Sequence, residues 1–300
     1  MNTITLGNFD GIHAGHLKVI EKARSFDGDT SLVCFEPVAR QYFNDKSWNR
    51  RLTTVSERAE ILSSLGMKNI IIIPFDMETV SKSPDEFLSE LHEKEKFRRI
   101  VVGYDFHFGR NRSGTVEYLF QWCTSREIDT IIVPPLKCGD GPVKSEKIRL
   151  LLENGDIQYA EELLGRHYSI TGVVSRGKGQ GRQIGYPTLN VRVPGCKLLP
   201  KSGSYAGYVY ATGGSRHLPA AIFVPRTATG PVEAHIIDHS AGDLYGSAVS
   251  VSFRKRLRDE ATSINIEKVK ELIAADVENV RQYALKENEW RSSKDEYNSR

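Results

Sequence analysis

The sequence has few cysteines, little net charge and no long hydrophobic run, and each shortage excludes a class of protein. The four cysteines, Cys34, Cys123, Cys138 and Cys196, form no CxxC pair and no cluster with histidine at the spacing of metal ligands. We therefore expect reduced thiols and no structural zinc site. The formal net charge of +3 over 300 residues is too small to indicate a nucleic-acid partner.

Hydrophobic residues are not gathered into a segment that could cross a membrane. The longest apolar run, 70–75, is far shorter than the roughly 20 residues that a membrane helix needs. No basic stretch followed by an apolar segment precedes Thr3–Leu6, so we expect no secretory signal. These features predict a cytoplasmic protein that binds neither membranes nor nucleic acids.

The composition is typical of a globular protein. Hydrophobic residues make up 39% of the chain and charged residues 26%, which is enough apolar surface for a core. Because single domains usually contain about 100–200 residues, a chain of 300 residues predicts two domains.

The first half of the chain alternates β-rich runs with helical patterns. We expect strands at 3–6, 31–36, 69–75, 99–104 and 129–133. Several of these runs are apolar on both faces, as in strands buried within a parallel sheet. We expect helices at 17–26, 54–65, 84–94, 115–126 and 145–153. This alternation predicts an α/β domain with a doubly wound parallel sheet over residues 1–160.

After Arg166 the pattern changes to short segments that are interrupted by glycine or proline. We expect strands at 169–174, 204–211, 218–223, 233–237 and 248–253. Turn signals at this spacing predict a small antiparallel β-barrel. One helical face then carries Ile266, Val269, Ile273, Val277, Val280 and Ala284. A C-terminal helix should therefore pack against the barrel, giving a second domain at 166–286 and a polar tail at 287–300.

The segment Gly7–His16, GNFDGIHAGH, joins the first predicted strand to the first predicted helix. Ligands of open α/β sheets bind beyond the carboxyl ends of the strands, where this loop must lie. Glycines let the backbone approach phosphates, and a helix N-terminus offers free N–H groups. His13 and His16 can both point at one phosphate and stabilise the charge that develops during in-line attack. The alternative is a glycine turn with two incidental histidines.

This loop resembles the nucleotide-binding signature of the HxGH nucleotidyltransferases, in the form found in bacterial FAD synthetases. The similarity continues through Phe35–Pro37, Leu52–Thr54, Val102–Gly109 and Arg112–Gly114. It implies that the first domain adenylylates FMN with ATP to give FAD and pyrophosphate, with His13 and His16 as catalytic residues. The nucleotide-binding residues that it implies are Gly7, Phe9, Asp10, Gly11, Asp105, Arg112, Ser145 and Arg149.

Two segments depart from this family pattern. Val38 and Ala39 follow Phe35–Pro37 where the family has a histidine and a proline. Lys144 and Glu146 replace a serine and a threonine of the S-S-T-x-I-R segment. Like charges about 4 Å apart repel by about 4 kcal/mol at an effective dielectric constant of 20. We therefore expect Glu146 to weaken ATP binding and to slow adenylyl transfer.

A second phosphate-binding pattern begins at Arg176, where RGKGQGR runs into QIGYPTLN. Glycine-rich basic segments can cover a polyphosphate, although hairpin turns have a similar composition. Thr188 and Asn190 are oxygen donors two residues apart, hence on one side of a strand. Because Mg²⁺ prefers oxygen ligands, the pair is a candidate metal site.

The segment from Gly181 to Asn190 resembles the GRxLGFPTAN signature of riboflavin kinases. Further matches are Val232–Asp238, Leu244–Gly246 and Leu257–Glu260. The resemblance implies ATP-dependent phosphorylation of riboflavin to FMN. It implies that Glu233 is the base near the riboflavin 5′-hydroxyl, that Arg258 lies against the flavin, and that Mg²⁺ is held by Thr188 and Asn190. The nucleotide-binding residues on this side are Gly177, Gly179, Gly181 and Arg182.

Other polar residues of this region have simpler interpretations. We expect His235 and His239 to be structural or solvent-facing, and Tyr245 to pack against the barrel. An ordinary strand carboxylate is the alternative for Glu233. The segment 222–230 is shorter than the corresponding family loop, so flavin contacts are expected to differ.

Together the resemblances predict a bifunctional enzyme that uses ATP and Mg²⁺ to convert riboflavin to FMN and FMN to FAD. Two other hypotheses stay open at this point. One is a riboflavin kinase whose first domain binds a nucleotide without catalysing transfer. The other is a regulatory protein that binds a flavin or a nucleotide. No sequence feature indicates an oligomeric state.

Overall fold

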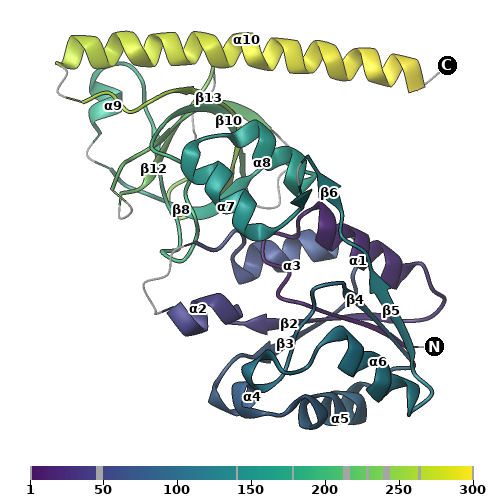
Figure 1. Cartoon of the computed structure of the whole chain (residues 1–300). Helices are drawn as coiled ribbons and strands as arrows, with labels where there is room; N and C mark the ends of the chain where they lie inside the picture. Colours follow the sequence, from purple (N-terminus) through teal and green to yellow (C-terminus); the bar gives the residue numbers. More distant parts are fainter. Residues whose placement is uncertain are drawn as a thin grey trace. The chain divides into compact units, whose positions relative to one another are not determined.

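The computed structural model describes residues 2–44, 50–139, 141–177, 179–211, 217–227, 230–238, 244–262 and 265–298. The chain forms two compact units, Met1–Lys147 and Ile148–Arg300, whose elements are labelled in Figure 1. Each unit has its own hydrophobic core.

The first unit contains a parallel sheet in the order β3-β2-β1-β4-β5. Its strands are β1 (Thr3–Leu6), β2 (Thr30–Glu36), β3 (Asn69–Pro74), β4 (Arg99–Gly103) and β5 (Asp129–Val133). The central strand β1 is buried along its whole length, whereas the edge strands β3 and β5 are partly exposed. The predicted doubly wound parallel sheet is confirmed.

Helices cover both faces of this sheet (Figure 1). They are α1 (Ala14–Arg24), α2 (Ala39–Asn44), α3 (Val55–Ser64), α4 (Met77–Ser81), α5 (Pro84–Glu95) and α6 (Val116–Thr124), with a 3₁₀ turn η1 (Arg110–Arg112). α1 and α3 pack near Leu32 on one face, and α5 and α6 pack near Val33 on the other. Adjacent residues of β2 thus point to opposite cores, as the two-residue period of a strand requires. A short hairpin, β6 (Lys137–Cys138) and β7 (Gly141–Pro142), follows β5.

The second unit contains a closed barrel in the order β10-β11-β12-β9-β8-β13. Its antiparallel strands are β8 (Ser169–Ser175), β9 (Leu189–Arg192), β10 (Gly203–Ala211), β11 (Leu218–Val224), β12 (Val232–Ile236) and β13 (Ala248–Arg258). The predicted barrel is confirmed. We expected a strand at Thr188 and Asn190 without giving its bounds, and β9 begins at Leu189. β13 continues beyond our expected end at residue 253.

Two helices before the barrel belong in part to this unit. Helix α7 (Ser145–Asn154) crosses the division between the units, and α8 (Ile157–Leu164) packs against β13. A Cβ at Gly155 would lie 2.6 Å from the Arg256 side chain of β13. This close packing explains why the contacts divide the chain earlier than the expected domain end at residue 160.

Helix α10 (Ile266–Asn298) packs on the barrel through one face. Val277, Val280 and Ala284 are buried, and the first two pack with Ala206 of β10. Ile266, which we placed on the same face, is instead 60% exposed because it lies at the start of the helix, before its contacts with the barrel. The helix also continues through most of the expected polar tail, where the sequence contains no glycine or proline to end it.

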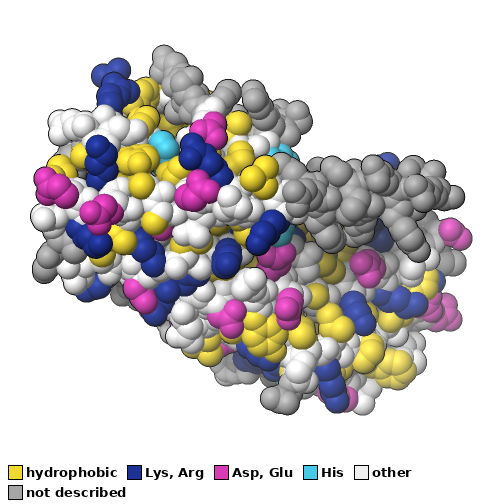
Figure 2. All heavy atoms as spheres, turned by 90° about the horizontal axis from the view of Figure 1, so that it is seen from above, with side chains coloured by type: hydrophobic (Ala, Val, Ile, Leu, Met, Phe, Trp, Pro, Cys, Tyr) yellow, Lys and Arg dark blue, Asp and Glu magenta, His cyan; other side chains and the backbone are white. Residues whose placement is uncertain are grey.

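The surface carries charges of both signs. On the face drawn in Figure 2, lysine and arginine side chains of the described residues alternate with aspartate and glutamate, and hydrophobic side chains are scattered among them. Among the described residues, no helix is both long enough and apolar enough to cross a membrane.

Candidate active sites

The loop between β1 and α1 has an unusual backbone. Phe9, Gly11 and Ile12 have positive φ angles of 48°, 84° and 39°. A Cβ at Gly11 would lie 2.7 Å from Cδ1 of Leu52, so a larger residue would not fit there without displacement. Backbone strain of this kind persists only where the surrounding contacts impose it, and such positions cluster at functional sites.

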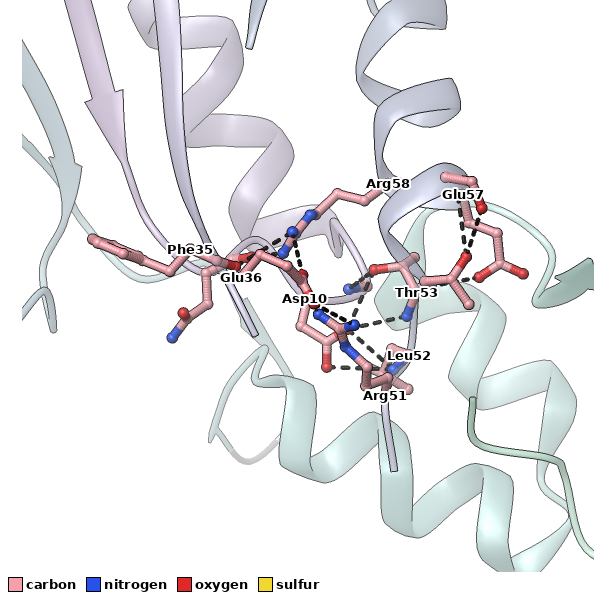
Figure 3. Close-up of polar contacts among 12 residues, drawn as sticks. Asp10, Phe35, Glu36, Arg51, Leu52, Thr53, Glu57 and Arg58 are labelled. Carbon is pink, nitrogen blue, oxygen red and sulfur yellow. Dashed lines mark hydrogen bonds and ion pairs between the residues drawn. The ribbon is translucent and has the colours of Figure 1, made fainter. Parts of the chain in front are cut away.

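Asp10 and Phe9, which we expected to bind a nucleotide, support this loop from within. The Asp10 carboxylate is 4% exposed and accepts hydrogen bonds from the N–H groups of Leu52 and Thr53 at 3.1 and 3.0 Å (Figure 3). The Thr53 hydroxyl accepts a hydrogen bond from the Gly11 N–H at 3.0 Å. The Phe9 ring is 1% exposed and belongs to the core beneath α1. Both side chains therefore hold the loop in shape.

The two predicted catalytic histidines lie against each other. His13 caps α1, and its Nδ1 accepts a hydrogen bond from the His16 N–H at 3.2 Å. The two rings stack with centroids 3.6 Å apart and planes 14° from parallel. Because Nδ1 of His13 accepts, the proton of the neutral ring lies on Nε2, where it can be donated to a phosphate oxygen.

Two buried arginines connect this loop to the end of β2 (Figure 3). Arg51 and Arg58 are 3% and 2% exposed, and their guanidinium groups share the carboxylate of Glu36, at 2.9 Å from Arg51 and 3.1 Å from Arg58. Arg58 also donates to the carbonyl oxygens of Asn8 and Phe35, at 2.9 and 3.3 Å. Sequence reasoning missed these residues because Arg58 lies 22 positions after Glu36.

The segment before α7 lies against the same loop. The Ser145 hydroxyl donates to the carbonyl oxygen of Asp10 at 3.0 Å. Nζ of Lys144 lies 3.7 Å from Oδ2 of Asp105, which follows the end of β4. The structure thus brings Asp105 and Ser145 to the edge of the sheet where we predicted a nucleotide.

Glu146, which we expected to repel ATP, has cationic partners in the first unit. Its carboxylate forms an ion pair with Arg40 of α2 and a second with Arg50, whose Nη1 lies 3.1 Å from Oε1. The fold therefore places two arginines beside this carboxylate, and its effect on ATP binding stays a prediction.

Three other residues predicted for this site have distinct surroundings. Gly7 leaves room for the Phe9 ring, because a Cβ at Gly7 would lie 3.1 Å from it. Arg112 ends η1 and has an exposed side chain. Arg149 lies within α7, is counted with the second unit and is 4% exposed. Nucleotide binding by these residues stays a prediction.

In the second unit, the glycine-rich segment lies directly over two side chains of the barrel. A Cβ at Gly177 would lie 2.3 Å from Nδ2 of Asn190, and one at Gly181 would lie 3.3 Å from the Thr188 hydroxyl. Gly179 has a φ of 72°, which glycine adopts without strain. The short helix α9 (Gln180–Gln183) follows, and its Arg182 is exposed. The glycines therefore allow the backbone to cover Thr188 and Asn190 closely.

Glu233 lies beside both predicted metal ligands. On β12 it is paired in register with Asn190 of β9, and its Oε2 accepts a long hydrogen bond from the Thr188 hydroxyl at 3.4 Å. Burial raises the pKa of Glu233, and the Thr188 hydrogen bond partly opposes that effect. A carboxylate with a raised pKa accepts a proton more readily near neutral pH.

Arg258, the predicted flavin contact, is held by the C-terminal helix. Its Nε and Nη2 donate to the Asp276 carboxylate at 3.1 and 2.7 Å, and Asp276 also accepts from the Ser204 hydroxyl at 2.8 Å. Asp276 is 4% exposed. Sequence reasoning missed it, although an acidic residue directly before buried Val277 was a usable signal.

The remaining polar residues near the barrel have mixed outcomes. The ring of His235 forms a hydrogen bond through Nδ1 with the carbonyl oxygen of Pro187 at 2.8 Å, consistent with a structural role. Tyr245, expected to pack against the barrel, is 45% exposed because it lies in the turn before β13, with the Arg176 guanidinium 5.8 Å from its ring. His239 lies outside the described residues.

The fold and the two sites define a two-domain transferase that acts on phosphate groups. The first unit matches the family model for FAD synthetase over residues 1–147, and the second matches the model for riboflavin kinase over residues 164–284. The chain belongs to the family of bifunctional riboflavin kinases/FMN adenylyltransferases.

Individual relatives support this membership along nearly the whole chain. A bifunctional riboflavin kinase/FMN adenylyltransferase of Pseudomonas fluorescens is 32% identical over 93% of this chain and 92% of the relative. The corresponding protein of Escherichia coli K12 is 31% identical, again over 93% and 92%. A crystal structure titled as a macrolide-efflux protein from Streptococcus pneumoniae superposes with a TM-score of 0.82 and 26% identity, and the match covers 93% of both chains.

Proposed function

We propose that this chain makes FMN and FAD in sequence. The second unit transfers the γ-phosphoryl group of ATP to the 5′-hydroxyl of riboflavin, and the first unit joins the resulting FMN to the AMP moiety of a second ATP. The observation that carries the proposal is that each family match contains its own formed site. One is the stacked pair His13 and His16, and the other is Glu233 beside Thr188 and Asn190.

In the kinase step Glu233 is the base. It takes the proton of the 5′-hydroxyl while that oxygen bonds to the γ-phosphorus, and the bond between this phosphorus and the bridging oxygen breaks to release ADP. The raised pKa of Glu233 suits this role. Arg258, fixed by Asp276, contacts the flavin. Gly177, Gly179, Gly181 and Arg182 bind the phosphates of ATP.

The residues around Glu233 fit a magnesium ion. The Thr188 hydroxyl, the Asn190 amide and the Glu233 carboxylate lie together. Any residue larger than glycine at position 177 would collide with the Asn190 side chain. No group of three or more His, Cys, Asp and Glu side chains suited to a metal occurs within the described ranges. This donor set therefore resembles the sparse sites in which Mg²⁺ binds one or two protein groups and substrate phosphates. Thr188 and Asn190 would hold the ion, which would neutralise phosphate charge.

In the adenylyl transfer, a phosphate oxygen of FMN bonds to the α-phosphorus of ATP and pyrophosphate leaves with the electron pair. Nε2 of His13 and the ring of His16 stabilise the charge on the α-phosphate. The loop of Gly7, Phe9, Asp10 and Gly11 sets their position, and Asp105, Arg112 and Ser145 complete the nucleotide site within the first unit. Reduced thiols such as those of Cys34 and Cys123 suit a cytoplasmic location.

One incubation tests the proposal. Purified protein is mixed with riboflavin, ATP and Mg²⁺, and flavins are separated by chromatography at successive times. We expect FMN to accumulate first and FAD to follow. FMN without FAD would favour a kinase whose first unit only binds a nucleotide, and the absence of both products would contradict the proposal.

A further inference from the structure

Phe223 of β11 is an aromatic side chain beside Glu233 to which the roles above assign no function. The two residues are directly paired between β11 and β12. Side chains paired in this way lie on the same face of a sheet, with their Cβ atoms about 4.5–5.5 Å apart. The Phe223 ring is therefore close enough to touch a molecule whose reacting group is bound at Glu233.

This pair belongs to a continuous row of side chains across the barrel. Each member is paired with the next member on the neighbouring strand, from β9 through β12, β11 and β10 to β13. The row consists of Asn190, Glu233, Phe223, Ser204 and Arg258. Its last two side chains demonstrably share one face, because the Ser204 hydroxyl and the Arg258 guanidinium both donate to the Asp276 carboxylate, at 2.8 and 2.7 Å.

The row lies on the outer face of the barrel. Ile222 and Val224, which flank Phe223 on β11, are 0% and 1% exposed, whereas Phe223 is only partly buried. Ala221 lies two residues before Phe223 and hence on the same face, and it packs against the cluster that contains Val277 of α10. Since α10 covers the barrel from outside, Phe223 also points outward, toward a surface that a substrate can reach.

The position of the ATP phosphates decides which substrate lies over Phe223. Asn190, with the glycine-rich segment that covers it, belongs to β9 and lies on one side of Glu233. Phe223 lies on the other side, because β12 separates β9 from β11. In phosphoryl transfer the attacking and leaving oxygens are roughly in line with the phosphorus. If the phosphates bind on the β9 side, the accepting hydroxyl reaches Glu233 from the β11 side, and the rest of the acceptor extends over Phe223.

We propose that Phe223 is a specificity-determining residue of the kinase reaction and that its ring packs against riboflavin next to the reacting hydroxyl. The inference rests on the proposed function of the second unit. Arg258 lies three strand spacings from Glu233, about 14 Å around the barrel, so an acceptor that contacts both residues must cross β11 and β10. Of the two row members between them, Ser204 is 2% exposed and is already bonded to Asp276. Phe223 therefore supplies the apolar contact surface, as aromatic side chains do at binding sites.

Phe223→Ala should weaken riboflavin binding by about tenfold or more and leave the KM for ATP within about twofold. Stacking of a nucleobase on an aromatic side chain contributes roughly 5- to 150-fold to binding by alanine substitution, and the flavin is a similar fused heterocycle. Calorimetric titration with riboflavin measures the affinity, and steady-state kinetics give the two KM values. A merely structural role for Phe223 would change both KM values together.

Two conservative variants keep the test decisive if Phe223→Ala does not fold. Phe223→Tyr keeps the ring and should bind riboflavin within about threefold of wild type. Phe223→Leu keeps an apolar side chain without the flat ring and should bind more weakly than Phe223→Tyr at a similar melting temperature. The matched control is Val173→Ala, because Val173 is also an apolar side chain on the barrel surface, 48% exposed, on β8. β8 adjoins β9 on the side away from Glu233, so this variant should leave the KM for riboflavin within about twofold.

These outcomes are distinguishable from failure of the proposed function. Wild-type protein that binds riboflavin without phosphorylating it contradicts the proposed function, and titration of the variants then still decides the role of Phe223. Wild-type protein that does not bind riboflavin overturns both. In an active wild-type background, three results overturn the inference alone: wild-type riboflavin affinity in folded Phe223→Ala or in Phe223→Leu, an equal rise in the two KM values, or a higher KM for ATP with an unchanged KM for riboflavin.

Discussion

Glu36→Gln is expected to destabilise the first unit strongly, because Glu36 is the carboxylate shared by two buried guanidinium groups. Arg51 and Arg58 are 3% and 2% exposed, whereas the Glu36 side chain is 28% exposed. The amide preserves the volume but removes the negative charge. Two buried cations then remain next to each other without the anion that offsets their repulsion and the loss of their hydration.

The size of the effect follows from this burial. Removing one partner of a buried ion pair costs about 3–5 kcal/mol, and partial exposure of Glu36 places the expected value near the lower end, at about 3 kcal/mol. For a folded unit of about 150 residues, 1 kcal/mol lowers the melting temperature by roughly 2–4 °C, so the midpoint should fall by about 6–12 °C. On heating, the variant should lose adenylyl transfer in the first unit before it loses kinase activity in the second, because Arg58 donates to the carbonyl oxygen of Asn8 in the phosphate loop.

Thermal unfolding followed by circular dichroism measures the shift, and hydrogen exchange of residues 7–16 shows whether the loop loosens. Glu90→Gln is the control, since Glu90 also joins two cations but is 41% exposed, and exposed ion pairs contribute at most about 1 kcal/mol. Equal melting temperatures for the two variants would refute the reasoning that burial makes the Glu36 cluster a support of the loop.

Three further expectations concern the second unit. Glu233→Gln should slow FMN formation by about 10²–10⁴-fold and leave the affinity for riboflavin within a few-fold of the wild-type value. The base must be deprotonated to act, and burial raises its pKa. Wild-type kinase activity should therefore fall as the pH drops through a value above about 4.3, the ordinary glutamate pKa. Asn190→Ala should raise the Mg²⁺ concentration for half-maximal kinase activity, and an unchanged magnesium curve would place the metal elsewhere. A fragment of residues 148–300 should fold and phosphorylate riboflavin. It should melt at a higher temperature than a fragment of residues 166–300, because α8 packs against β13. Equal melting temperatures would show that α7 and α8 do not support the barrel.

Hydrophobic periodicity was sufficient to predict most elements of the fold. The short β-rich runs of the parallel sheet are separated by helical patterns, and β1 and β5 begin and end at the predicted residues. The bounds of β9 were not predicted, because it has only four residues and follows directly on the Pro187–Thr188 motif. β13 continues through Arg254–Arg258, where most residues are charged. The alternation of apolar and polar residues that predicts a strand is therefore missing from this part of the sequence.

The site was predictable in its motifs but not in its long-range contacts. The spacing of His13 and His16 predicted their proximity, and the structure stacks their rings. For Asp10, by contrast, the sequence did not reveal that its carboxylate accepts a hydrogen bond from the N–H of Thr53, 43 residues away. The arginines around Glu146 were invisible for the same reason, since a sequence shows a charge but not the charges that the fold brings to it.

The most direct test of the account assigns each product to its own site by following FMN and FAD in wild type, Glu233→Gln and His16→Ala. With riboflavin as substrate, wild type should make FMN and then FAD, and Glu233→Gln should make neither at an appreciable rate. Supplied with FMN, Glu233→Gln should make FAD at the wild-type rate. His16→Ala should make FMN from riboflavin but no FAD from either flavin. Loss of both activities in either variant while it remains folded, or FAD formation by His16→Ala at the wild-type rate, would contradict two independent sites with these residues at their centres.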